Sequence, residues 1–171
     1  MRQNDTPMIV RHLAVCGLAS LIAIFVSLLG MTIAYTVKYG DYGFLPWRLL
    51  FVFSAGLAYA LVLGFVGAFI FLTTGLTIAR WTKASPFGYV FWGAAAGVAH
   101  EGAGLALQRF LSSLPNETAN RLSHAADAVI WLGGFAVTFA GYGFDPQWMF
   151  VIAPIAGACA GLFAGWQARN R

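Results

Sequence analysis

Three long apolar stretches limit what this chain can fold into more than any other feature. They cover residues 13–37, 49–79 and 148–166 of a 171-residue chain in which only 9% of the residues are charged. An α-helix rises about 1.5 Å per residue, so crossing a hydrocarbon core of roughly 30 Å takes about 20 apolar residues. Each stretch comes close to that length or exceeds it. The sequence therefore predicts an all-α protein, a polytopic helical membrane bundle.

We expect four clear transmembrane helices within a single integral-membrane domain, residues 1–171. The boundaries that the sequence favours are about 11–37, 48–80, 86–108 and 148–167. Ser85 is a good N-cap for the third helix, and Pro86 suits its first turn because the missing N–H costs nothing there. Pro154 lies inside the last helix and predicts a kink.

A fifth segment, residues 124–143, decides how many times the chain crosses. Its uncharged core contains four glycines: Gly133, Gly134, Gly141 and Gly143. Such a segment either crosses the bilayer as a short helix, enters and leaves it on the same side, or lies on the surface of the bundle. Four crossings and five crossings put equal numbers of Lys and Arg on the cytoplasmic side, so the totals do not decide between them. Arg2 and Arg11 precede the first helix and only Lys38 closely follows it, which favours an amino terminus inside the cell.

Small residues recur at helical spacing on the predicted helices. The first helix carries them at Cys16, Ser20, Ala23, Ser27, Gly30 and Ala34, and the second at Gly56, Ala60, Gly64 and Ala68. The third and last helices have glycine faces made of Gly93 and Gly97, and of Gly157, Gly161 and Gly165. Small residues let helix backbones approach closely, which drives helix association in a bilayer. These faces either pack the helices within the chain, or one remains for oligomerisation, and the Gly157 series is then the candidate.

The third helix also carries two ionisable residues near its middle. On a helical wheel, His100 shares the face of Gly93 and Gly97, Glu101 borders that face, and Gln108 lies near it. Ionisable groups at membrane depth are costly and usually mark a pathway or are paired. Three interpretations stay open: polar groups that specify packing, a proton or ion site of His100, Glu101 and Gln108, and haem or metal ligation by His100.

No motif in the chain indicates a particular catalysed reaction. The run from His100 begins like the zinc-protease motif HExxH, but Gly104 stands where the second histidine is required. Nucleophile-elbow, phosphate-loop and dinucleotide signatures are missing as well. We expect no catalytic residues, no metal site and no cofactor, so enzymatic activity is disfavoured. The basic residues are dispersed along the chain, which argues against a nucleic-acid partner.

Two functional hypotheses follow. The first is a structural or accessory subunit that packs through small-residue faces against itself or another membrane protein. The second is a small oligomeric, proton- or cation-linked transporter or channel protomer that uses His100 and Glu101. A wet cavity beside Glu101 favours the second hypothesis, and a lipid-facing or dry position favours the first. The size of the chain favours the inner (cytoplasmic) membrane of a bacterium.

Overall fold

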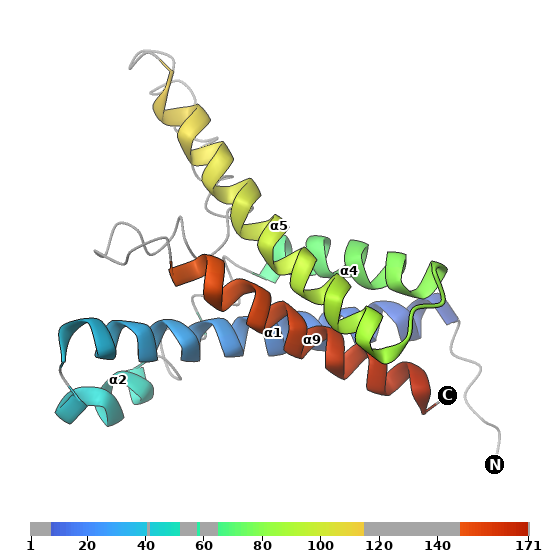
Figure 1. Ribbon diagram of the computed structural model, residues 1–171, viewed down its shortest axis with the longest axis horizontal. Helices are drawn as coiled ribbons and strands as arrows, with labels where there is room; N and C mark the ends of the chain where they lie inside the picture. Colours follow the sequence, from blue (N-terminus) through green and yellow to red (C-terminus); the bar gives the residue numbers. More distant parts are fainter. Residues whose placement is uncertain (1–7, 41, 52–57, 59–64, 115–147, 171) are drawn as a thin grey trace.

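The regular elements of this chain are helical. A computed structural model describes residues 8–40, 42–51, 58, 65–114 and 148–170, and it has no strand within those residues (Figure 1). The all-α prediction is confirmed there. The elements are α1 (Met8–Tyr39), the 3-10 helix η1 (Tyr42–Phe44), α2 (Leu45–Phe51), α4 (Phe65–Trp81), α5 (Pro86–Ser112) and α9 (Met149–Arg169).

The helix bounds differ in detail from those expected. Both α1 and α5 extend beyond residues 11–37 and 86–108, and α9 ends two residues later than the expected 167. The range 48–80 corresponds to α2 and α4, and most residues between these helices lie outside the described part of the chain. Other expectations also lie outside it: the segment 124–143 and the small residues Gly56, Ala60 and Gly64.

Within the described residues, two helices, α1 and α9, are long and apolar enough to cross a membrane. The sequence led us to expect four. The described part of α4 is apolar but has 17 residues, and α5 contains His100 and Glu101 among many small residues, which lowers its hydropathy. Four crossings therefore remain a prediction.

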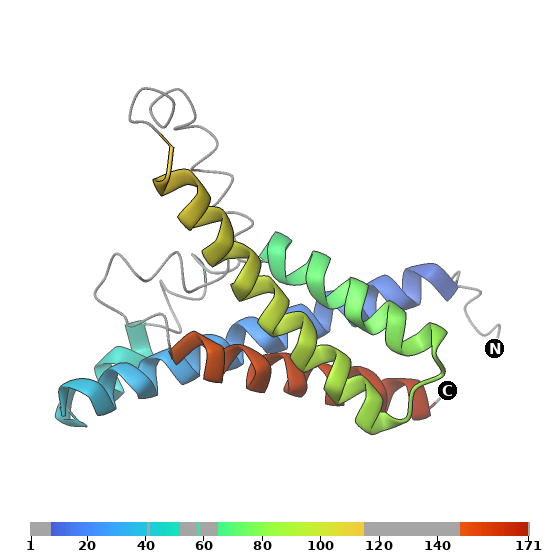
Figure 2. The same cartoon turned by 45° about the horizontal axis from the view of Figure 1, so that its top comes forward.

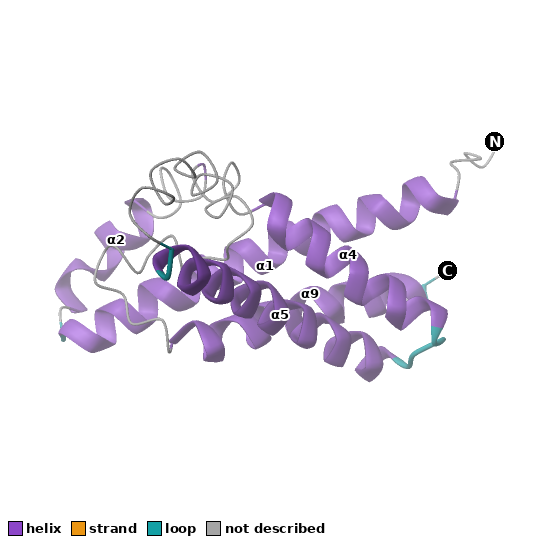
Figure 3. Ribbon diagram, turned by 90° about the horizontal axis from the view of Figure 1, so that it is seen from above, coloured by secondary structure: helices purple, strands orange, loops and turns teal. Residues whose placement is uncertain are grey.

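The long helices form an antiparallel bundle. His12, near the start of α1, bonds to Thr77, near the end of α4, and Gly30 of α1 lies against Ile152 at the start of α9. A Cβ on Gly75 of α4 would lie 2.8 Å from the carbonyl oxygen of Trp92 in α5. As a result, the start of α1, the turn between α4 and α5, and the end of α9 lie at one end (Figures 1 and 3).

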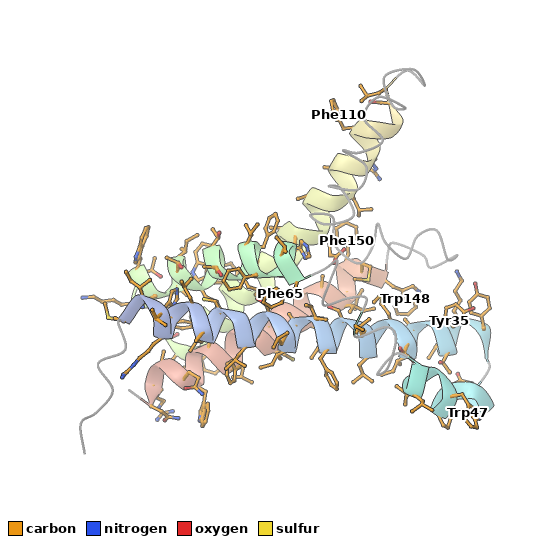
Figure 4. The ribbon with its side chains drawn as sticks, turned by 180° about the vertical axis from the view of Figure 1, so that it is seen from behind. Tyr35, Trp47, Phe65, Phe110, Trp148 and Phe150 are labelled. Atoms are coloured by element: carbon orange, nitrogen blue, oxygen red, sulfur yellow. The ribbon has the colours of Figure 1, made fainter. Side chains whose placement is uncertain are left out.

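Helix α5 packs along its neighbours for only part of its length. Its first half crosses α9, and its second half diverges from α1, α4 and α9 (Figure 2). Phe110, near its far end, is 59% exposed and is labelled in Figure 4. Among the described residues, those that fix α5 in the bundle therefore lie between Pro86 and Leu105.

The bundle buries many small and polar side chains beside core residues such as Ile24, Leu76 and Met149, and it leaves many other large apolar side chains exposed. Helix α1 shows this most clearly, because its buried residues include Cys16, Ser20, Ser27, Thr32 and Thr36. Its exposed residues include Leu18, Leu21, Phe25, Ile33 and Val37. A water-soluble protein buries such large apolar side chains instead. The pattern matches a helix whose outer face contacts lipid and whose inner face permits close packing.

Aromatic side chains gather at both ends of the bundle. Figure 4 shows Tyr35, Trp47 and Trp148 at the end opposite the chain termini. At the other end, Trp81 closes α4 and Trp166 lies in the last turns of α9, both exposed. Tryptophan and tyrosine are enriched where a membrane meets water. Their placement supports a bundle whose long axis crosses the bilayer.

Candidate polar site at the centre of the bundle

The contact between α5 and α9 is made by backbone against backbone. Gly93 lies on Gly157 and Gly161, and a Cβ on Gly93 would come 3.0 Å from the nitrogen and Cα of Gly161. A Cβ on Gly97 would collide with the carbonyl group of Ala153. Only glycine permits this approach, because any side chain would force the helices apart.

This contact changes how the glycines of α9 are understood. Gly157 and Gly161 face α5 of the same chain, and Gly165 lies against Tyr89, with 3.2 Å from its would-be Cβ to that of Tyr89. We named this series as the candidate surface for oligomerisation. That expectation is wrong, because all three glycines are covered within the chain.

The glycine contact sets the position of the polar residues. His100 and Glu101 follow Gly97 by one turn of α5, so they enter the bundle where α5 is closest to α9. His100 is 5% exposed and Glu101 is 2% exposed. Gln108 also belongs to α5, but its side chain lies outside the described part of the structure. The structure therefore brings two of the three predicted site residues into the interior.

His100 and Glu101 line a small cavity between the four long helices. Its volume is about 20 Å³, which is room for about one water molecule. Every long helix contributes to its wall: Ala23, Ile24 and Ser27 from α1; Ala68, Phe71 and Leu72 from α4; Ala96 and Gly97 from α5; Ala153, Ala156 and Gly157 from α9. The hydroxyl-bearing Ser27 adds a further polar side chain. Glu101 thus faces the interior of the bundle rather than lipid.

The imidazole of His100 is held beside an aromatic ring. Its centroid lies 5.3 Å from that of Phe71, and the two ring planes are tilted by 37°. Phe71 comes from α4, so the ring contact fixes His100 relative to a second helix. Aromatic pairs of this kind contribute about 0.5–1.5 kcal/mol beyond their buried area. The geometry leaves the carboxyl group of Glu101 and the imidazole of His100 on adjacent residues at one depth.

Metal ligation receives no support from this geometry. Among the described residues, no three His, Cys, Asp or Glu side chains come close enough together to hold a metal ion. Gly104, at the position of the second histidine in the zinc motif, is buried within α5. The carboxyl group of Glu101 and the imidazole of His100 are each able to gain or lose a proton.

A second cavity lies at the end of the bundle that holds the chain termini. Its volume is about 250 Å³, and its wall includes His12, Arg80 and Tyr89. The imidazole Nε2 of His12 lies 3.0 Å from the hydroxyl of Thr77 and 3.7 Å from the Sγ of Cys16. Sequence reasoning missed this cavity, because its residues come from helices that are far apart along the chain.

No protein-family model matches the chain, and neither a curated protein nor a solved structure matches it.

Proposed function

We propose that this chain is an integral membrane protein that binds a proton or small cation at Glu101, with His100 beside it, as part of a transport or channel activity. The observation that supports this most strongly is the position of Glu101. It is 2% exposed and lines a cavity walled by four helices. Ionisable residues in that position are expensive to keep and mark ion and proton pathways.

The chemistry of the two side chains suits a proton site. A carboxyl group and an imidazole both gain and lose protons, and imidazole does so near neutral pH. Burial penalises the charged form of either group. A cavity with room for about one water allows a proton to pass between side chains that do not touch directly. A transient cation would be held by the carboxylate in the same place.

Two features support a membrane location: the apolar side chains exposed on the bundle surface, and the basic residues at one end of the bundle. α1 and α9 are long and apolar enough to cross, and α1 exposes its large apolar side chains. Arg11, Arg80, Lys83 and Arg169 all lie near the end that holds the chain termini. Basic residues collect on the cytoplasmic side of inner-membrane proteins. We therefore propose a bacterial inner membrane, with both termini in the cytoplasm.

The competing hypothesis is an accessory subunit that packs against a partner through its small-residue faces, and the faces of α5 and α9 give it no support. The faces of α5 and α9 are occupied by each other within the chain. A homo-oligomer stays part of the proposal, because a cavity for about one water does not form a continuous path through a single copy.

The test is ion flux through purified protein in liposomes. Liposomes carrying the protein are given a potassium diffusion potential, and an internal pH dye reports proton entry; a sodium dye reports sodium entry in a parallel series. We expect the natural protein to conduct one of these ions and Glu101→Gln to reduce the flux to that of empty liposomes.

Ser20→Ala is the matched control for this test. Ser20 is also buried, but its hydroxyl donates to the carbonyl oxygen of Cys16 in its own helix, and it does not line the cavity. We expect this variant to keep the natural flux. Equal flux through the natural protein and Glu101→Gln would contradict the proposal, as would flux no greater than that of empty liposomes.

A further inference from the structure

The larger cavity combines a basic wall with apolar neighbours. Residues from all four long helices line it: His12 and Val15 from α1, Leu76 and Arg80 from α4, Tyr89 from α5, and Ala164 and Ala168 from α9. Its volume of about 250 Å³ approaches the lower end of small-molecule sites, roughly 300 Å³. The cavity is therefore large enough for a small polar group rather than a single water.

The charge around this cavity is positive. Arg80 is half-buried in its wall, and Arg11, Lys83 and Arg169 lie at the same end of the bundle. None of the described residues that line the cavity is acidic. Within the described part of the chain, Glu101 is the one acidic residue, and it lines the other cavity. An anion entering this end thus meets positive charge, with no described carboxylate in the wall to repel it.

The polar groups of the wall are held in place by neighbouring helices. His12 is fixed by its bond to Thr77 of α4. The backbone and Cβ of Tyr89 are fixed by close contact with Gly161 and Gly165 of α9, and its side chain packs against the buried cluster that contains Leu76 and Ala164. Side chains that are already ordered lose little further entropy when a ligand binds. Arg80 adds a planar guanidinium, whose paired donors match the oxygens of a phosphate group.

The position of the cavity also limits which ligands it could bind. It lies at the end where Trp81 and Trp166 are exposed, the depth at which a membrane protein meets lipid headgroups. Val15, Leu76 and Ala164 provide an apolar wall next to Arg80. We infer that this cavity binds the phosphate group of an anionic ligand, with Arg80 as the charged partner and His12 and Tyr89 as hydrogen-bonding partners. Either an anionic phospholipid or a free phosphate supplies that chemistry.

The experiment measures binding of two probes to the purified, delipidated full chain in a neutral detergent. Inorganic phosphate is titrated by calorimetry, and short-chain phosphatidylglycerol is titrated with phosphatidylcholine as the zwitterionic reference. Phosphatidylglycerol binding without phosphate binding identifies a lipid headgroup site. Binding of inorganic phosphate identifies a site for a free anion. Either result supports the cavity as a phosphate site, provided that it depends on Arg80.

Arg80→Gln is compared with Lys83→Gln as the matched control. Both changes remove one positive charge at the same end of the bundle, but Lys83 is exposed in the turn and does not line the cavity. We expect Arg80→Gln to weaken binding by about tenfold or more, the size of a lost charge-assisted bond. Lys83→Gln is expected to change it less than about twofold, since an exposed charge acts weakly.

Tyr89→Phe provides a second test, because it removes only a hydroxyl and preserves the ring. We expect binding about threefold weaker, the size of a neutral hydrogen bond. If Arg80→Gln is not monodisperse, this variant decides the question. The inference is overturned if neither probe binds, if Arg80→Gln and Lys83→Gln weaken binding equally, or if Tyr89→Phe binds like the natural protein.

Discussion

Helices α1 and α5 both bring polar groups and glycines into the bundle, and they do so in opposite ways. On α1, the hydroxyls of Ser20, Thr32 and Thr36 each donate to the carbonyl oxygen four residues earlier, at 2.8 Å. On α5, the buried polar groups belong to His100 and Glu101, which line a cavity shared by four helices. These three hydroxyls of α1 are therefore satisfied within their own helix, whereas the buried polar groups of α5 lie among side chains of other helices.

The glycines of the two helices also differ in what surrounds them. A Cβ on Gly30 of α1 would meet the side chain of Ile152, which is able to move. A Cβ on Gly93 of α5 would meet the backbone of α9, which cannot move without shifting the whole helix. The comparison indicates that an added side chain is tolerated better at Gly30 of α1 than at Gly93 of α5.

The largest effect is expected from placing a positive charge in the central cavity. Glu101→Lys puts an ammonium group in a space of about 20 Å³, and burying such an ion costs several kcal/mol. We expect little monodisperse protein after detergent extraction. Glu101→Gln, which keeps the size of the side chain, is expected to yield folded protein. If Glu101→Lys were obtained in normal yield with a normal melting temperature, the polar site of α5 would not depend on the assembled bundle, and the contrast with α1 would be wrong.

The next largest effect is expected at the glycine contact of α5. Gly93→Ala forces the helices apart and should lower the free energy of unfolding by about 1–3 kcal/mol, as overpacking does. Gly102→Ala on the same helix has no heavy atom within 4 Å of its new Cβ. It should change stability by at most about 1 kcal/mol. Denaturant unfolding in detergent measures both, and equal destabilisation would show that the contact is looser than described.

A smaller cost is expected for the corresponding change on α1. Gly30→Ala brings a Cβ to 2.9 Å from Cγ2 of Ile152, and this side chain can rotate away at a cost of about 1 kcal/mol. Adding Ile152→Ala should make the Gly30→Ala change nearly neutral, which a double-mutant cycle of unfolding free energies detects. Additive effects would mean that the two residues do not meet. Gly17→Ala, into open space, is the control.

The smallest effect is expected for a hydroxyl of α1. Thr36→Val keeps the shape of the side chain, and the carbonyl oxygen of Thr32 still has the helical N–H as its donor. We expect a change within about 0.5 kcal/mol in the free energy of unfolding, because such hydroxyl bonds to the preceding turn stabilise little. A loss above about 2 kcal/mol would place the polar groups of α1 in the same category as those of α5.

Periodicity predicted the parts of this structure that depend on one helix. The apolar stretches indicated helices, and the spacing of Gly93 and Gly97 indicated a face suited to close packing. The wheel placed His100 on that face, and the structure buries it there. These features follow from 3.6 residues per turn, a local property of the sequence.

Features that depend on several helices could not be predicted in this way. The partner of the Gly157 series was open, because a glycine face looks the same whether its partner belongs to the same chain or to another. The cavity at Arg80 was missed because His12 and Tyr89 approach it from two helices and lie far apart in the sequence. Four crossings were expected from length alone, while the hydropathy of α5 is reduced by the residues that give it a polar site.

The glycine contact between α5 and α9 has a geometrical consequence. Tyr89, Gly93 and Gly97 now lie opposite Gly161, Gly157 and Ala153. Because Gly93 and Gly97 are four residues apart, as are Gly157 and Gly161, a slide of one turn, about 5.4 Å, would set Gly93 directly opposite Gly161 and Gly97 opposite Gly157. The single Gly–Gly pair of the present register would become two, so the backbones would still be able to approach closely. The two helices would thus have two packing registers, and a shift from one to the other would move Glu101 one turn along α9.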